Sequence, residues 1–144
     1  KGDGVDDLLS TISESLPAGP WLYPEDQLSD MNERLFAAEI TREKLFLLLH
    51  QELPYSLTVE TDGWEERKDG SVKINQVIFV ERKGHKGIVL GNRGQQVKRV
   101  GEAARKELEN HLDRRVHLFL FVKVRQNWRE DPDRYKQMGL DFEI

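Results

Sequence analysis

The order of apolar and polar residues predicts two helices in the first third of the chain. The first helix carries its apolar residues on one face: Val5, Leu8, Leu9, Ile12 and Leu16. Three prolines within residues 17–29 then predict an extended linker. Asp30 followed by Glu33 is a capping-box pattern, so we expect a second helix to begin at Asp30 and to run to about His50.

Alternation of apolar and polar residues predicts three β-strands in the rest of the chain. Residues 57–66 and 74–80 lie on either side of the turn sequence Lys68-Asp69-Gly70-Ser71, which is typical of a β-hairpin. A short helix over 84–90 and a longer helix ending at Leu112 should follow, and then a third strand over 116–124. That strand is apolar on both faces, so we expect it to be well covered.

The predicted element order, α-β-β-α-α-β, indicates an α+β fold. We expect a three-stranded mixed sheet that helices cover on one face, because a sheet must bury its apolar side. The hairpin makes strands one and two antiparallel, and the return through two helices permits a parallel third strand. A short terminal helix is predicted over 129–138.

Gly91-Asn92-Arg93-Gly94, between the two later helices, is the strongest indication of function. Glycine has no Cβ and adopts left-handed backbone angles at little cost, so this turn lets a ligand approach the backbone closely. A helix starting at Gly94 also directs unpaired N–H groups and a partial positive charge towards the turn. These features suit a phosphate, and more particularly the sugar-phosphate backbone of a nucleic acid.

Positive charge is concentrated around this turn. Residues 82–99 contain six Lys or Arg and no Asp or Glu, whereas the whole chain has a formal net charge of −4. A local basic cluster in an acidic chain is the electrostatic footprint of a nucleic-acid site. A solvated basic helix face is the alternative interpretation.

Composition argues against several other kinds of site. The chain has no Cys, which excludes disulfides, thiolate metal sites and a cysteine nucleophile. No apolar stretch approaches the roughly 20 residues that a membrane helix needs. The four histidines lack the spacing of metal ligands, and no pair of residues indicates a nucleophile with its base.

The element order and the position of the glycine turn resemble a type II KH domain, an RNA-binding fold whose GxxG loop clamps about four nucleotides. Longer segments resemble the C-terminal half of the Era family of GTPases: Glu43-Lys44-Leu45, Glu52-Leu53-Pro54-Tyr55-Ser56, Ile78-Phe79-Val80-Glu81-Arg82, Ile88 to Gly94 and Val116-His117-Leu118. In that family a GTP-binding domain precedes a linker and a type II KH domain. The resemblance implies that residues 1–29 are a remnant helix of the GTPase domain with its linker, and that residues 30–144 are the KH domain.

The Era resemblance implies a role in ribosome assembly. The expected partners are the 3′ end of small-subunit (16S) ribosomal RNA and the 30S subunit, in the bacterial cytoplasm and sometimes at its membrane; DNA is not expected. The phosphate-loop motif GxxxxGK[ST] is absent from the sequence. We therefore expect no GTP turnover and no cofactor for this chain, with GTP and Mg belonging to a domain of the longer parent protein.

We expect single-stranded RNA to lie in a groove between the glycine loop and the second strand. The expected contacts to its backbone are Gly91, Asn92, Arg93, Gly94, Gln95, Lys86, Lys98 and Arg99. The expected apolar floor is Ile88, Val89, Val77 and Phe79, together with Val97; a purely structural role in the core is the alternative for each of these. A protein-interaction module that uses the KH-like fold and the first helix is the second functional hypothesis.

Overall fold

The computed structural model describes residues 2–20, 32–49 and 56–128, and the chain divides into two compact units between Asp30 and Met31. The first unit contains helix α1, Val5–Ser15, whose apolar side chains are exposed. Most of the predicted linker and the predicted helix over 129–138 lie outside the described residues. None of the described helices is long and apolar enough to cross a membrane.

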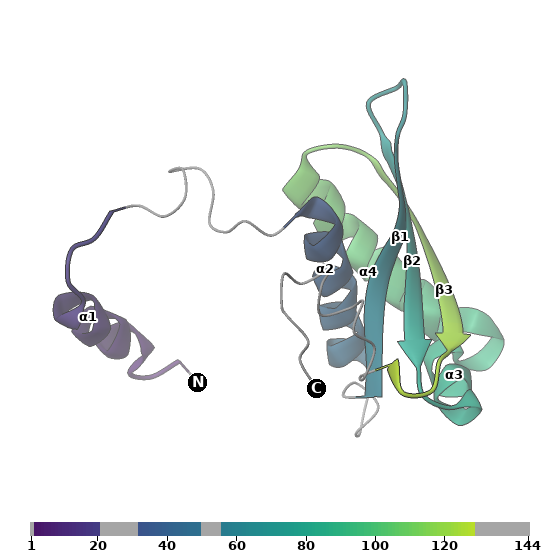
Figure 1. Cartoon of the computed structure of the whole chain (residues 1–144), viewed down its shortest axis with the longest axis horizontal. Helices are drawn as coiled ribbons and strands as arrows, with labels where there is room; N and C mark the ends of the chain where they lie inside the picture. The colour runs from purple at the N-terminus through teal and green to yellow at the C-terminus, as the bar shows by residue number, and fades with distance from the viewer. Residues whose placement is uncertain (1, 21–31, 50–55, 129–144) are drawn as a thin grey trace. The chain divides into compact units, whose positions relative to one another are not determined.

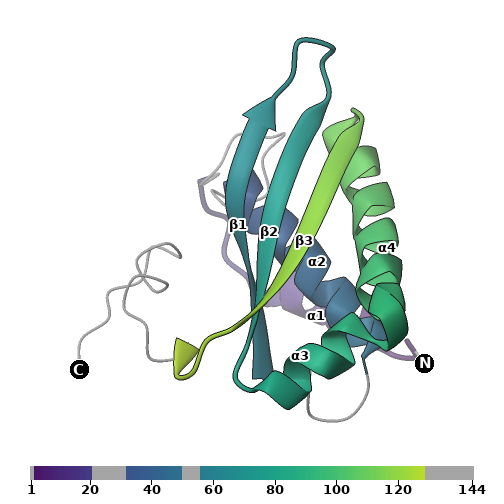
Figure 2. The ribbon, with the colours of Figure 1, turned by 90° about the vertical axis from the view of Figure 1, so that its right-hand side faces the viewer.

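The second unit has the predicted order of elements. These are α2 (Glu33–Leu48), β1 (Leu57–Glu66), β2 (Val72–Val80), α3 (Lys83–Leu90), the 3-10 turn η2 (Asn92–Gly94), α4 (Gln95–Leu112) and β3 (Val116–Val124). The sheet order is β1-β2-β3, with β1 antiparallel and β3 parallel to β2. Helices α2 and α4 cover one face of this sheet, and within the described part of the unit no helix covers the opposite face, called the open face below (Figures 1 and 2). The predicted α+β class and mixed sheet are confirmed.

The hydrophobic core lies between the helices and the sheet, in two clusters. Leu45, Ile78, Val89 and Val100 belong to one cluster, and Ile74 and Leu108 belong to the other. All six are fully buried. The apolar faces that the sequence predicts for the helices and the strands therefore pack against each other in one layer. This packing holds α3 and α4 in place against the sheet.

A short chain of polar side chains crosses this core. The hydroxyl of Thr41 on α2 donates to Gln76 Oε1 on β2 over 2.6 Å, and Gln76 Nε2 donates to Thr61 Oγ1 on β1 over 3.3 Å. The Thr61 hydroxyl donates in turn to the carbonyl of Arg34 over 2.7 Å. Thr41 and Gln76 are fully buried, so these bonds replace their lost contacts with water and connect α2 to both strands of the hairpin.

The start of α2 corrects the predicted cap. Asn32 is the N-cap residue, and its side chain accepts a hydrogen bond from the Leu35 N–H over 2.8 Å. Glu33 is therefore the first helical residue, and Asp30 lies outside the described residues. Asn is as good an N-cap as Asp, so either Asp30 or Asn32 could have begun the helix. The predicted start of α2 is therefore two residues too early.

The prediction that β3 is well covered is wrong. β3 is an edge strand, and its two faces differ: Val116 and Val122 are buried against the helices, while Phe119 and Phe121 are exposed on the open face. Apolar residues on both faces of a strand indicate burial only when both faces have a covering layer.

The polar chain yields a prediction about stability. Thr41→Val removes the donor to Gln76 and leaves a buried amide oxygen without that bond, which should lower the free energy of unfolding by about 1–3 kcal/mol. Thr11→Val is the matched control, since Thr11 is also helical but exposed and should change stability by less than about 0.5 kcal/mol. Urea unfolding measures both variants, and an equal effect at the two positions would contradict the assigned role of Thr41.

Candidate nucleic-acid interface

The loop between α3 and α4 has an unusual backbone. Gly91 (φ 69°, ψ −174°), Arg93 (φ 50°, ψ 30°) and Gly94 (φ 78°, ψ 10°) all have positive φ. A 3.3 Å hydrogen bond from the Gly94 N–H to the Gly91 carbonyl closes the turn. The chain thus reverses within four residues and begins α4 at Gln95, with the first N–H groups of that helix beside the loop.

The two glycines of the loop serve different purposes. A Cβ on Gly91 would lie 2.6 Å from Gln96 Cβ, closer than any real contact, whereas a Cβ on Gly94 would have nothing within 4 Å. Gly91 is therefore required by packing inside the protein. Gly94 is required by its backbone angle, and the open space above it leaves the start of α4 accessible to a ligand.

Gln96 connects the loop to the rest of the fold. Its Nε2 donates to the carbonyl of Leu48, the last residue of α2, over 2.8 Å. Gly91 packs against the same side chain. The loop is consequently held from behind by α2, while its polar residues remain on the outside.

The basic residues around the loop lack acidic partners within the described part of the chain. Asn92, Arg93, Gln95, Lys98 and Arg99 are exposed, and Lys86 is half-buried. No described carboxylate forms an ion pair with any of the four predicted basic contacts: Lys86, Arg93, Lys98 and Arg99. The charge around the loop is thus available to an anionic ligand.

Several basic residues elsewhere in the described part of the unit form ion pairs. Lys44 pairs with Glu107, Lys106 with Glu102, Arg105 with Glu109 and Arg114 with Glu66. The cations around the loop differ from these paired residues, because positive charge is concentrated there and the two signs are not mixed.

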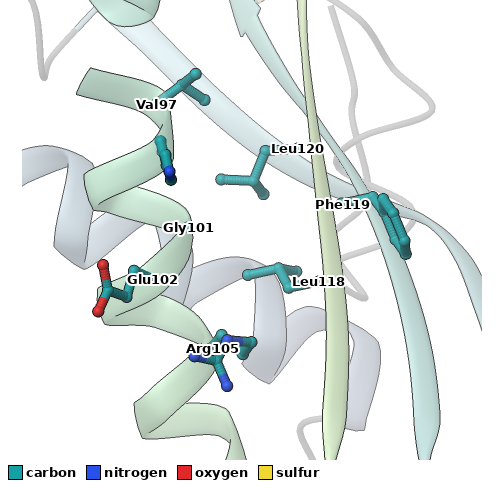
Figure 3. Close-up of a pocket in the computed structure, with 8 residues that line it drawn as sticks. Val97, Gly101, Glu102, Arg105, Leu118, Phe119 and Leu120 are labelled. Atoms are coloured by element: carbon teal, nitrogen blue, oxygen red, sulfur yellow. The ribbon is translucent and has the colours of Figure 1, made fainter. Parts of the chain in front are cut away.

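A groove of about 460 Å³ lies between α4 and β3 (Figure 3). Its lining residues are Val97, Lys98, Gly101, Glu102, Arg105, Leu118, Phe119 and Leu120. The expected groove beside the second strand is therefore corrected: β2 is the central strand, and β3 forms the edge next to α4. Gly101 keeps the groove open, because a Cβ there would lie 3.4 Å from Leu120 Cδ1.

The residues predicted as the apolar floor separate into two groups. Val89 is 0% exposed and belongs to the hydrophobic core, as the core interpretation has it. Val77 is 3% exposed, although the register places it on the same face of the sheet as Phe79, so neither side chain offers surface to a ligand. Ile88 is 55% exposed beside the loop, and Phe79 is half-buried on the open face of the sheet. Val97 does line the groove, together with Leu118 and Leu120, which the sequence argument missed although their strand was predicted.

The groove also contains a carboxylate among its cations. A hydrogen bond and the positive charge of Lys106, with smaller contributions from Arg105 and Lys98, hold the pKa of Glu102 below its ordinary value. Glu102 is thus ionised at neutral pH and repels phosphate from the middle of the groove. Among the loop cations, Lys98 interacts electrostatically with Glu102, so the position most favourable for a phosphate is at Arg93 and the start of α4.

No cluster of His, Asp or Glu suited to a metal ion occurs among the described residues. The chemistry of the described surface is instead that of backbone N–H groups, cations and an apolar groove. Such a surface can hold a phosphodiester chain at the loop and place its bases along α4 and β3.

Residues 52–129 match the model of the KH domain family, and the chain belongs to that family. Its order of elements and its parallel β3 are those of the type II form. The resemblance to Era proteins is also confirmed. The chain is 64% identical over 141 residues to the GTPase Era of Brucella suis and 63% identical over 142 residues to that of Dinoroseobacter shibae.

These alignments cover 98% and 99% of the chain but only 45% and 46% of the two relatives, so the chain spans about half their length. Among solved structures, the chain is similar to a single-residue variant of Aquifex aeolicus Era bound to GDP.AlF4⁻. It is equally similar to an Era in complex with MgGDPNP and nucleotides 1506–1542 of 16S ribosomal RNA. Each match has a TM-score of 0.83 and 38% identity and covers 96% of this chain and 47% of the other.

The loop geometry predicts a graded response to alanine. Gly94→Ala should lower the free energy of unfolding by about 1–2 kcal/mol, the cost of a left-handed backbone angle in a residue with a Cβ. Gly91→Ala should cost more, because its Cβ also overlaps Gln96. Gly84→Ala in α3, with open space and no positive φ, should stabilise the helix by about 0.5–1 kcal/mol. Thermal unfolding of the three variants measures the order, and equal losses at positions 91 and 94 would contradict the packing role of Gly91.

Proposed function

We propose that this chain is a single-stranded RNA-binding module that binds the 3′ end of small-subunit ribosomal RNA through residues 91–94. The observation that carries the proposal is the cluster of cations without ion partners in the described structure, placed around an open glycine turn at the start of α4. The similarity to an Era solved with nucleotides 1506–1542 of 16S ribosomal RNA supports the choice of RNA.

In this proposal the loop holds the RNA backbone and the groove receives the bases. Arg93 and the first N–H groups of α4 bind phosphates, and Lys86, Lys98 and Arg99 add electrostatic attraction. Asn92 and Gln95 supply uncharged hydrogen bonds at the loop. Ile88 extends the exposed apolar surface from the loop towards the groove, and base edges face Val97 and Glu102.

The module would act as part of a longer protein. We propose that the parent is a ribosome-assembly GTPase of the bacterial cytoplasm that acts on the 30S subunit, with GTP and Mg bound outside this sequence. The absence of a phosphate-loop motif supports a binding role for this chain, without GTP turnover of its own. Peripheral association of the parent with the membrane stays a prediction.

Reversing the charge of the loop should abolish RNA binding. The double variant Asn92→Asp, Arg93→Asp should weaken binding of a labelled 3′ segment of small-subunit ribosomal RNA by about tenfold or more, because charged hydrogen bonds contribute about 1.5–3 kcal/mol each. Fluorescence anisotropy at two salt concentrations measures the effect. Wild-type affinity should fall with salt, since RNA binding releases counterions.

The matched control is the double variant Asn110→Asp, Arg115→Asp, which makes the same chemical changes at exposed positions near the other end of α4. It should retain most of the wild-type affinity. Equal losses in both variants would indicate a general charge effect, and unchanged affinity in the loop variant would overturn the proposal. Strong capture of a protein partner with no RNA binding would favour the interaction-module hypothesis.

A further inference from the structure

The groove between α4 and β3 has a carboxylate on one wall and apolar side chains on the other. Of the described residues that line it, only Glu102 has an acidic side chain. Glu102 lies on the α4 side of the groove, and Leu118 and Leu120 lie on the β3 side (Figure 3). The Glu102 side chain is 55% exposed, so a ligand in the groove can reach its carboxylate without any change in the fold.

One oxygen of this carboxylate is already engaged. Lys106 Nζ lies 3.1 Å from Glu102 Oε1, one turn further along α4. Among the described residues, no donor is bonded to the second oxygen, Oε2. The hydrogen bond from Lys106, together with its charge, keeps the pKa of Glu102 below the ordinary value, so at neutral pH the free oxygen acts only as a hydrogen-bond acceptor.

The position of Glu102 along α4 brings it within reach of an RNA strand held at the loop. Glu102 follows Gln95, the first residue of the helix, by about two turns, or about 10 Å. In the proposed complex a strand anchored at the start of α4 passes Glu102 within the roughly four nucleotides that a KH domain holds. Since Glu102 repels phosphate, the strand presents a base at this point.

The cations that line the same groove are placed differently. Arg105 Nη1 donates to Glu109 Oε2 over 2.8 Å, so this guanidinium is held by a neighbour on its own helix. Lys98 lies one turn closer to the loop, beside the proposed phosphate contacts. The polar group best placed to meet the edge of a base in the middle of the groove is therefore the free oxygen of Glu102.

An acceptor at this point distinguishes the bases by their exocyclic groups. Cytosine, adenine and guanine carry an amino group that can donate to a carboxylate, and the Watson–Crick edges of single-stranded bases are open to such contacts. Uracil has the carbonyl oxygen O4 where cytosine has its N4 amino group. A carboxylate that faces O4 gains no hydrogen bond and repels that oxygen, and a site built around such a bond rejects the analogue that lacks the donor.

We infer that Glu102 determines base specificity in the groove: it accepts a hydrogen bond from the exocyclic amino group of one bound base and so selects cytosine over uracil at that position. This inference rests on the proposed RNA-binding function and deepens it. Contacts at the glycine loop hold the backbone, which is the same in every sequence, whereas Glu102 reads a base.

The test measures discrimination between cytosine and uracil by the 144-residue chain. A labelled single-stranded fragment of the 3′ segment of small-subunit ribosomal RNA is compared with versions in which each cytosine in turn is replaced by uridine. At one position the wild-type chain should lose about tenfold in affinity, the effect of one hydrogen bond to a charged group. Glu102→Gln should reduce this ratio to about twofold or less, because an amide offers both a donor and an acceptor.

The readout is the ratio of the two affinities, since removing a negative charge strengthens the binding of both RNAs. Glu43→Gln is the matched control. Glu43 is 54% exposed and lies 3.0 Å from the Lys44 ammonium, much as Glu102 lies beside Lys106, but it belongs to α2 and does not line the groove. This variant makes the same chemical change and should keep the wild-type ratio at every position.

Each contrary outcome has a distinct meaning. If the wild-type chain shows no preference for cytosine at any position, or if Glu102→Gln keeps the wild-type ratio, the inference is overturned while the loop function stands. If Glu43→Gln lowers the ratio as much as Glu102→Gln does, the preference is a general effect of charge and the inference is again overturned. If the unmodified fragment does not bind at all, the proposed function itself fails.

Discussion

The close packing of Gly91 on Gln96 is the constraint on which the loop and the groove depend. A Cβ at position 91 would come within 2.6 Å of Gln96 Cβ, so the chain can turn at this point only with glycine. The same glutamine donates to the carbonyl that ends α2. The turn is therefore set by interactions within the protein before any ligand arrives. In the proposed complex such pre-organisation lowers the entropy lost on binding, because the RNA would not have to order the loop backbone.

The parallel pairing of β3 with β2 explains where this turn lies. A parallel connection must carry the chain back along the sheet, and α3, η2 and α4 together form that crossover. Helix α4 then runs beside the edge strand, and the groove between them includes Gly101 in its lining. The glycine turn begins the same helix, so one crossover supplies both the glycine loop and the groove wall at which RNA binding is proposed. An antiparallel third strand joined by a short hairpin would have supplied neither.

Much of this arrangement could be predicted from the chain alone. Helical spacing located α2 and α4, alternation located the three strands, and the glycine turn marked the site. The errors have physical causes: Asp30 and Asn32 are equally good caps, and hydrophobicity does not show which strand of a sheet is the edge. The bulge between Thr61 and Gly63 is a further example. It shifts the alternation of β1, so that Trp64 faces the helices with Thr61. Gly63 was the available signal, because an isolated glycine within a strand often marks a bulge.

The charged residues of α4 differ between its two ends: those near its end stabilise the fold, and those near its start belong to the proposed binding site. Near its start, Lys98 and Arg99 have no described ion partner. Near its end, Glu109 pairs with Arg105 and also accepts a hydrogen bond from the Val116 N–H over 3.2 Å, which ties the helix to the first residue of β3. Charges that stabilise the fold are satisfied within it, so they have little attraction left for a ligand. The cations at the start of the helix repel one another, and an anionic partner would make their clustering favourable.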